Sequence, residues 1–166
     1  MTYNVKIHPR VLSALFDIKG SIGDVTAHLK EHIGSFPTEP NSYISQGDWK
    51  VFHVGLNHWI LMAPINDEQK LLCSLKPDDA PASVSIVLIS DTLTFFYLDG
   101  PDTFDIMSIA CPLNLNNDTF TAESVTFSEM FGLKALIFRD GPGFQFAVDQ
   151  SFGEMVFEYL NLTLAD

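Results

Sequence analysis

Apolar residues recur with the helical period of three to four positions in four segments of the chain. These segments are residues 22–33, 66–76, 101–111 and 152–160. Ser21 and Asn66 can each cap the helix that follows them, and Gly34 can end the first helix. Prolines directly after the second and third segments stop both of them. The pattern therefore predicts four amphipathic helices.

Short apolar runs between these helices predict strands. They are residues 11–18, 50–54, 58–63, 84–89, 92–98, 125–130, 135–139 and 144–148. Residues 55–57 can form a hairpin turn, residues 84–98 suggest a further antiparallel pair, and the last three runs suggest a meander. We expect an α+β fold of short antiparallel sheets with four helices, in a single domain at residues 1–166.

Charge narrows the range of partners. The chain has 166 residues, with 9 basic and 21 acidic side chains and a net charge of −12. Such a surface repels phosphate, so nucleic acid and anionic membranes are not expected partners. It suits docking onto a basic protein surface, and it is equally consistent with a salty habitat. No apolar run reaches the roughly 20 residues of a membrane span. The first residues lack signal-peptide features, so we expect a cytoplasmic protein.

The sequence contains few signs of catalytic or metal-binding chemistry. His28 and His32 stand in an H-x-x-E-H pattern, in which two histidines on one helix face can share a metal ion. The apolar stripe of the same helix favours a solvated helix edge instead, and we predict no metal site. We also predict no catalytic residue, because neither a G-x-S-x-G nor a G-x-G-x-x-G motif occurs. Cys73 and Cys111 are expected to be buried free thiols.

Three acidic residues gather where the third helix begins. Asp99, Asp102 and Asp105 suit the positive end of the helix dipole, while Asp99 alone also stands at a strand end, where it could face a ligand. Trp59 lies on an apolar strand and is expected in the core or in an interface rather than stacked on a ligand. Trp49 follows Gly47 and Asp48, so we expect it to be exposed and a candidate anchor for a partner.

Three stretches of the sequence, taken in order, form a recognisable set. The first pairs residues 37–42 with the hairpin at 54–61, and the second pairs residues 98–107 with 111–115. The third is the closing segment at 135–152. Together they span almost the whole chain, and the ordered set resembles the gamma subunits of heterotetrameric sarcosine oxidases. The gamma subunits themselves look like the folate-binding domain of aminomethyltransferases, which is the fold that the resemblance implies.

The resemblance also implies a function. The chain would be a non-catalytic structural subunit of a flavin-dependent sarcosine (N-methyl amine) oxidase complex, supporting oxidative demethylation coupled to tetrahydrofolate. Its partners would be larger alpha and beta subunits, which would hold the flavin, NAD and tetrahydrofolate, while this chain would bind no cofactor. The alternative is a stand-alone tetrahydrofolate-binding or aminomethyltransferase-like protein, for which Trp59 and Asp99 are the candidate pocket residues.

Overall fold

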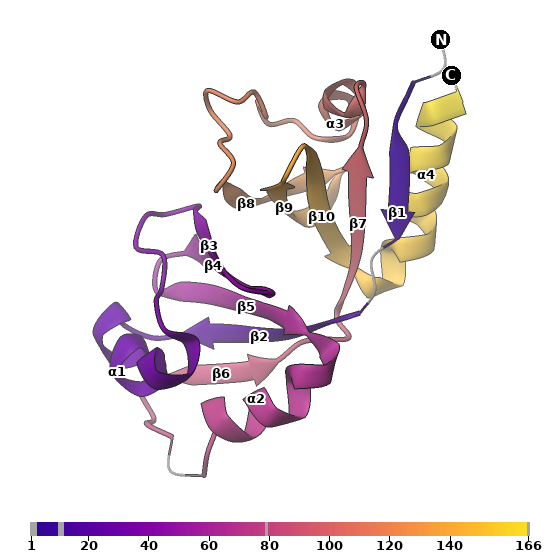
Figure 1. Cartoon of the computed structure of the whole chain (residues 1–166). Coiled ribbons are helices and arrows are strands. Elements are labelled where there is room, and N and C mark those ends of the chain that lie inside the picture. The colour runs from indigo at the N-terminus through magenta and orange to yellow at the C-terminus, as the bar shows by residue number, and fades with distance from the viewer. Residues whose placement is uncertain (1–2, 10–11, 79, 166) are drawn as a thin grey trace. The chain divides into compact units, whose positions relative to one another are not determined.

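The computed structural model describes residues 3–9, 12–78 and 80–165. Its strands are β1 (Lys6–Pro9), β2 (Ser13–Lys19), β3 (Tyr43–Gln46), β4 (Trp49–Gly55), β5 (His58–Pro64), β6 (Ser85–Leu88), β7 (Leu93–Asp99), β8 (Val125–Met130), β9 (Leu133–Asp140) and β10 (Gly143–Asp149). Its α-helices are α1 (Ile22–Ile33), α2 (Glu68–Leu75), α3 (Thr103–Ala110) and α4 (Gly153–Ala165). Single 3₁₀ turns precede α2 (Ile65–Asp67) and α4 (Gln150–Phe152). The predicted α+β class with antiparallel sheets is confirmed (Figure 1).

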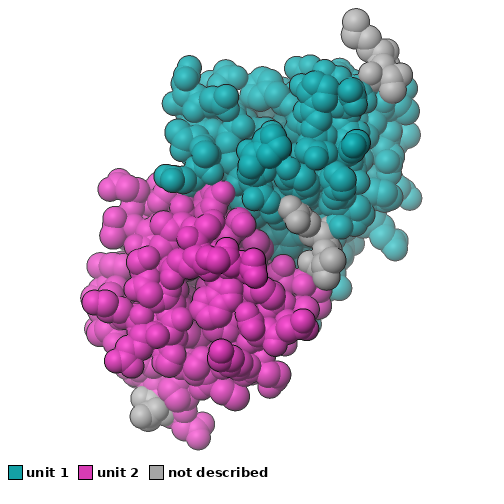
Figure 2. Space-filling model, viewed as in Figure 1, with its two compact units in different colours: residues 1–11, 91–166 teal, residues 12–90 magenta. Residues whose placement is uncertain are grey.

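The strands form two five-stranded antiparallel sheets. One has the order β1-β7-β10-β9-β8 and the other the order β3-β4-β5-β2-β6. The contacts divide the chain accordingly into unit 1, residues 1–11 and 91–166, and unit 2, residues 12–90 (Figure 2). Unit 2 is thus a continuous segment between two pieces of unit 1. This division into two compact units does not test whether residues 1–166 form a single domain, so the single domain stays a prediction.

Apolar side chains alternate along the strands, so they gather on one face of each sheet and form the core of each unit. In unit 1, Phe96, Phe146 and Ile137 point to one face of the sheet, where α3 and α4 cover them. In unit 2, α1 and α2 lie beside the sheet (Figure 1), and their apolar residues share one core cluster with Phe16 on β2 and Trp59 on β5. The helices therefore lie where the period of their apolar residues predicts.

Local signals account for most of the predicted boundaries. The Ser21 hydroxyl accepts a hydrogen bond from the Asp24 backbone N–H at 3.1 Å, so the predicted cap of α1 is confirmed. The helix ends at Gly34, which has a φ of 84° that favours glycine. The hairpin β4–β5 and the meander β8–β9–β10 are confirmed as well.

Three local predictions were wrong. The expected pair at residues 84–98 does not form, because β6 pairs with β2 in one sheet and β7 pairs with β1 and β10 in the other. The cap of α2 is Asp67 rather than Asn66, since a 3₁₀ turn comes before the helix. Cys73 is exposed because α2 buries Leu71 and Leu75 on its other side, whereas Cys111 is buried as expected and both thiols are free.

No helix in the described part of the chain combines the length and apolar character that crossing a bilayer requires.

Candidate functional site

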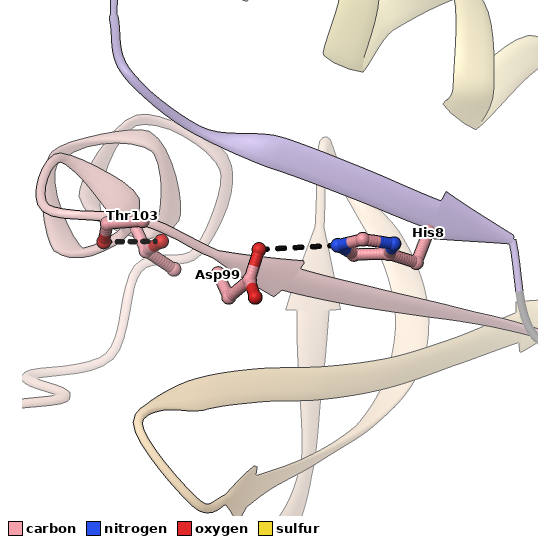
Figure 3. Close-up of polar contacts among 4 residues, drawn as sticks. His8, Asp99 and Thr103 are labelled. Carbon is pink, nitrogen blue, oxygen red and sulfur yellow. Dashed lines mark hydrogen bonds and ion pairs between the residues drawn. The ribbon is translucent and has the colours of Figure 1, made fainter.

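Asp99 lies at the end of β7 and faces a histidine from the neighbouring strand. His8 Nε2 on β1 is 3.1 Å from Asp99 Oδ1, and because a carboxylate only accepts hydrogen bonds, the imidazole donates (Figure 3). The sequence showed no partner for His8, because the two residues are far apart along the chain. The pair cross-links β1 to β7, and both side chains remain within reach of water. Asp99 thus has a structural partner, and a role in ligand binding stays a prediction.

The start of α3 is held by neighbouring polar groups. Asp102 Oδ2 accepts the Asn4 backbone N–H at 2.7 Å, which ties the N-terminal segment to this corner. Thr103 closes the turn by donating its hydroxyl to the Gly100 carbonyl at 2.8 Å (Figure 3). Asp105 lies in the first turn of the helix, where the dipole stabilises negative charge. Asp99 and Asp102 therefore each have a hydrogen-bond partner within unit 1, in addition to any stabilisation by the helix dipole.

Arg139 on β9 is a residue that sequence reasoning missed. Its Nε donates to the Phe120 carbonyl at 2.6 Å and its Nη2 donates to the Leu115 carbonyl at 2.7 Å. The guanidinium also lies over the Phe144 ring, with Cζ 4.5 Å from the ring centroid. Burial lowers the pKa of the Arg139 guanidinium from its usual value, but an arginine stays protonated in proteins. The positively charged Arg139 side chain therefore holds the loop between α3 and β8 through its hydrogen bonds to two carbonyls of that loop.

Trp59 lies in the core of unit 2, as the sequence predicts. It is 2% exposed and its indole N–H donates to the Pro37 carbonyl at 3.1 Å. His53 stacks on the indole at a centroid distance of 4.9 Å, and Phe36 meets it edge-on. A ligand ring could stack on Trp59 only if these neighbours moved. The side chain therefore fits a pterin poorly, and its part in a folate pocket stays a prediction.

Trp49 is less exposed than expected. Its indole N–H donates to Asp67 Oδ2 at 3.1 Å, and the ring packs partly against the core of unit 2. This hydrogen bond holds the indole against the turn before α2, which explains its partial burial. Its proposed role as a partner anchor is untested.

The two helix histidines do not share one environment. His28 Nε2 is 2.9 Å from the Leu75 carbonyl oxygen, so that nitrogen is occupied by a hydrogen bond to α2. His32 is exposed in the last turn of α1. Within residues 3–9, 12–78 and 80–165, no group of three or more His, Cys, Asp or Glu side chains is placed to hold a metal ion.

His58 forms a second carboxylate pair that the sequence did not reveal. Its Nε2 hydrogen-bonds to Asp17 Oδ1 between β5 and β2, and the Lys19 ammonium is 3.2 Å from Asp17 Oδ2. Asp17 and Lys19 share one face of β2 and His58 is the partner of Lys19 in register, which brings the three together. An imidazole and an ammonium group bound to one carboxylate favour a structural role within this sheet.

Comparison with solved structures shows which known proteins share the fold. A chain of the heterotetrameric sarcosine oxidase from Corynebacterium sp. U-96, solved in complex with pyrrole 2-carboxylate, aligns with a TM-score of 0.84 at 16% identity, covering 97% of this chain and 84% of that one. The glycine cleavage system aminomethyltransferase T from Bartonella henselae aligns with a TM-score of 0.68 at 13% identity, covering 96% of this chain but 46% of that one. No family model and no curated protein sequence matches the chain.

These alignments confirm the fold that the sequence motifs suggested. The chain is similar throughout its length to one chain of a heterotetrameric oxidase, and it corresponds to about half of an aminomethyltransferase. At sequence identities of 16% and 13%, these alignments show that the fold is shared.

Proposed function

We propose that this chain is a non-catalytic structural subunit of a heteromeric flavin-dependent sarcosine (N-methyl amine) oxidase. The observation that carries the proposal is the alignment with the Corynebacterium oxidase chain, which covers 97% of this chain and 84% of that one. The ordered sequence motifs support it independently. In such a complex this chain would stabilise larger alpha and beta subunits during oxidative demethylation coupled to tetrahydrofolate.

The cofactors are proposed to belong to the partners. Flavin and nicotinamide dinucleotides are held by glycine-rich loops at helix N-termini, and this sequence has no G-x-G-x-x-G motif. The histidine–carboxylate pairs His8–Asp99 and His58–Asp17 each join two strands of one sheet. These pairs support a role in holding the fold, while the acidic surface suits a basic partner.

Purification from the native host tests the proposed assembly. The tagged chain is expected to copurify with two larger polypeptides in constant proportion, together with flavin absorbance that follows those polypeptides in size-exclusion chromatography. Because flavin is assigned to the partners, the chain purified alone is expected to lack that absorbance. A chain that elutes alone from its native host at every salt concentration would contradict the proposal.

Trp49 is the residue proposed to anchor a partner. Interface hot spots of this type are worth about 2 kcal/mol or more, so Trp49→Ala is expected to weaken the complex by roughly thirtyfold. The matched control is Leu56→Ala, which removes an apolar side chain that is 93% exposed in the turn between β4 and β5. Affinities are compared by surface plasmon resonance after circular dichroism has shown both variants folded. Equal affinities for Trp49→Ala and the parent would reject this anchor.

The aminomethyltransferase alignment keeps tetrahydrofolate binding as a second candidate. The chain has two tryptophans, and both belong to unit 2. Because Trp59 is one of them, a folate bound at Trp59 would change tryptophan fluorescence. A saturable change on titrating tetrahydrofolate into the isolated chain would favour this second function. No change is expected if folate is held by the partner.

A further inference from the structure

Exposed apolar residues of unit 1 are concentrated in two segments. Among its described residues, all seven large apolar side chains that are exposed lie between residues 104 and 113 or between residues 152 and 162. In unit 2 the exposed ones that the structure describes, Leu12, Ile22, Leu56 and Val87, come from separate parts of the chain. Single exposed apolar residues are ordinary on a soluble protein, whereas a contiguous group marks an interaction surface.

Two contacts join the end of α3 to α4 through the turn between β8 and β9. The Phe131 backbone N–H in this turn donates to the Ala110 carbonyl at 2.7 Å, and the Phe131 ring meets the Tyr159 ring edge-on at a centroid distance of 5.6 Å. Ile109 precedes Ala110 and is 56% exposed, while Leu162 lies one helical turn beyond Tyr159 and is 64% exposed. Ile109, Phe131, Tyr159 and Leu162 together are named the apolar patch.

Acidic side chains border the apolar patch. Asp105 lies four residues before Ile109 on α3, and Glu158 lies four residues before Leu162 on α4. Residues with this spacing are neighbours on a helix surface, so each acid stands beside a patch residue. Both acids are exposed. Residues 104–113 and 152–162 include no lysine, arginine or histidine.

The basic residues of unit 1 that the structure describes lie elsewhere. Lys6 and Lys134 each stand between two residues that pack into the core covered by α3 and α4, so both side chains point to the other face of the sheet. Arg139 lies at the end of β9 that is remote from the turn, where it donates to carbonyls of the loop before β8. No described lysine or arginine of unit 1 therefore neutralises the acids beside the apolar patch.

This combination of an apolar centre and an acidic border selects among partners. A second copy of the chain would bring the same acids against the patch, and like charges placed opposite each other oppose association. A partner whose own apolar surface is bordered by lysine and arginine would instead place opposite charges together.

We propose that the apolar patch is the surface on which a different protein docks, one that presents apolar side chains bordered by lysine and arginine. This inference rests on the proposed function, in which that protein is one of the two larger subunits. Trp49, the proposed anchor, belongs to unit 2, so the patch in unit 1 is tested separately from it.

A positive charge placed in the patch tests the proposal on the complex purified from the native host. Leu162→Arg removes apolar area and sets a cation against a basic partner, so it is expected to weaken binding to the purified partner subunits about thirtyfold or more. Leu56→Arg makes the same change at an exposed apolar residue of unit 2 and is expected to keep the affinity within about twofold. Surface plasmon resonance measures both variants after circular dichroism has shown them folded.

Reversing one acid tests the charged border separately. Glu158→Lys is expected to weaken the same binding about tenfold at low salt, and the difference from the parent is expected to shrink as the salt concentration rises. Glu31→Lys reverses an exposed acid on α1 in unit 2 and is the matched control. Equal losses for Glu158→Lys and Glu31→Lys would mean general charge attraction and would overturn the proposed border.

The outcomes separate this inference from the proposed function. If the parent binds the partner subunits and Leu162→Arg binds them equally well, the patch is not the docking surface while the proposed function stands. A parent that binds no partner removes both. If the isolated parent sediments as a dimer that Leu162→Arg converts to a monomer, a second copy occupies the patch and the inference is overturned.

Discussion

Gly143→Ala is expected to destabilise the chain by about 3 kcal/mol, the upper end of the usual cost of overpacking. An added Cβ at Gly143 would lie 2.2 Å from the Leu98 carbonyl oxygen and 2.8 Å from Tyr97 Cε2. The obstacle is backbone, and both strands involved, β10 and β7, have neighbours on either side in the sheet. Neither strand can move away without breaking a second ladder of hydrogen bonds, so the clash cannot be relieved locally.

Gly141→Ala is the matched control, in the turn directly before β10. Gly141 has a φ of 57° and no heavy atom within 4 Å of an added Cβ, so only backbone strain of about 1 kcal/mol is expected. Urea unfolding followed by far-ultraviolet circular dichroism measures both variants. If Gly143→Ala cost no more than Gly141→Ala, the close approach of β10 to β7 would be incorrect.

Phe146→Ala is expected to cost about 3–5 kcal/mol, as for other fully buried phenylalanines. Phe146 is 0% exposed at the centre of β10 and stacks on Phe96 with ring centroids 5.3 Å apart. Truncation leaves a cavity beneath α4 that the surrounding strands cannot fill. Phe152→Ala is the control, because Phe152 is 40% exposed and its loss should cost less than about 1 kcal/mol.

The same variant tests the single-domain prediction. Both tryptophans report on unit 2, whereas Phe146 belongs to unit 1. If residues 1–166 unfold as one domain, Phe146→Ala shifts the urea midpoints of tryptophan fluorescence and of circular dichroism equally. If the units unfold separately, the fluorescence midpoint stays near that of the parent and the single-domain prediction is wrong.

Elements with strong local signals could be predicted from the sequence. Helix α1 has a cap, an apolar period and a terminating glycine, and the β4–β5 hairpin has a short polar turn between two apolar runs. The last helix was found from the period of Phe152, Met155, Val156, Tyr159 and Leu160, although only Val156 and Leu160 of these are buried. Residues 155 and 159 contribute less because the helix covers the sheet with a narrow stripe.

Long-range pairing could not be predicted from local pattern. Strands β6 and β7 are neighbours in sequence and have suitable apolar residues, yet each finds its partners in a different sheet. Strand β1 was missed because its four residues are mostly polar and exposed, and it is recognisable only beside β7. The division of the chain into two units follows from the same distant pairings.

The candidate site was predicted least well for the same reason. Asp99 was identified from its place at a strand end, but its partner His8 is 91 positions away in the chain. Arg139 was not recognised, because its role depends on two carbonyls of a loop that has no sequence signature. Side-chain chemistry of this kind becomes visible only after the strands have been placed.

The pairing of β1 with β7 constrains the order in which the strands can pair while the protein is being synthesised. Strand β1 leaves the ribosome before residues 12–90, but the strand it pairs with ends at Asp99, after the whole of residues 12–90 has been made. Residues 12–90 can complete their own sheet while later residues are still being added, because all five strands of that sheet are already present. Strand β1, although made before residues 12–90, would then pair only after them, and until then it is open to premature association with other nascent polypeptides.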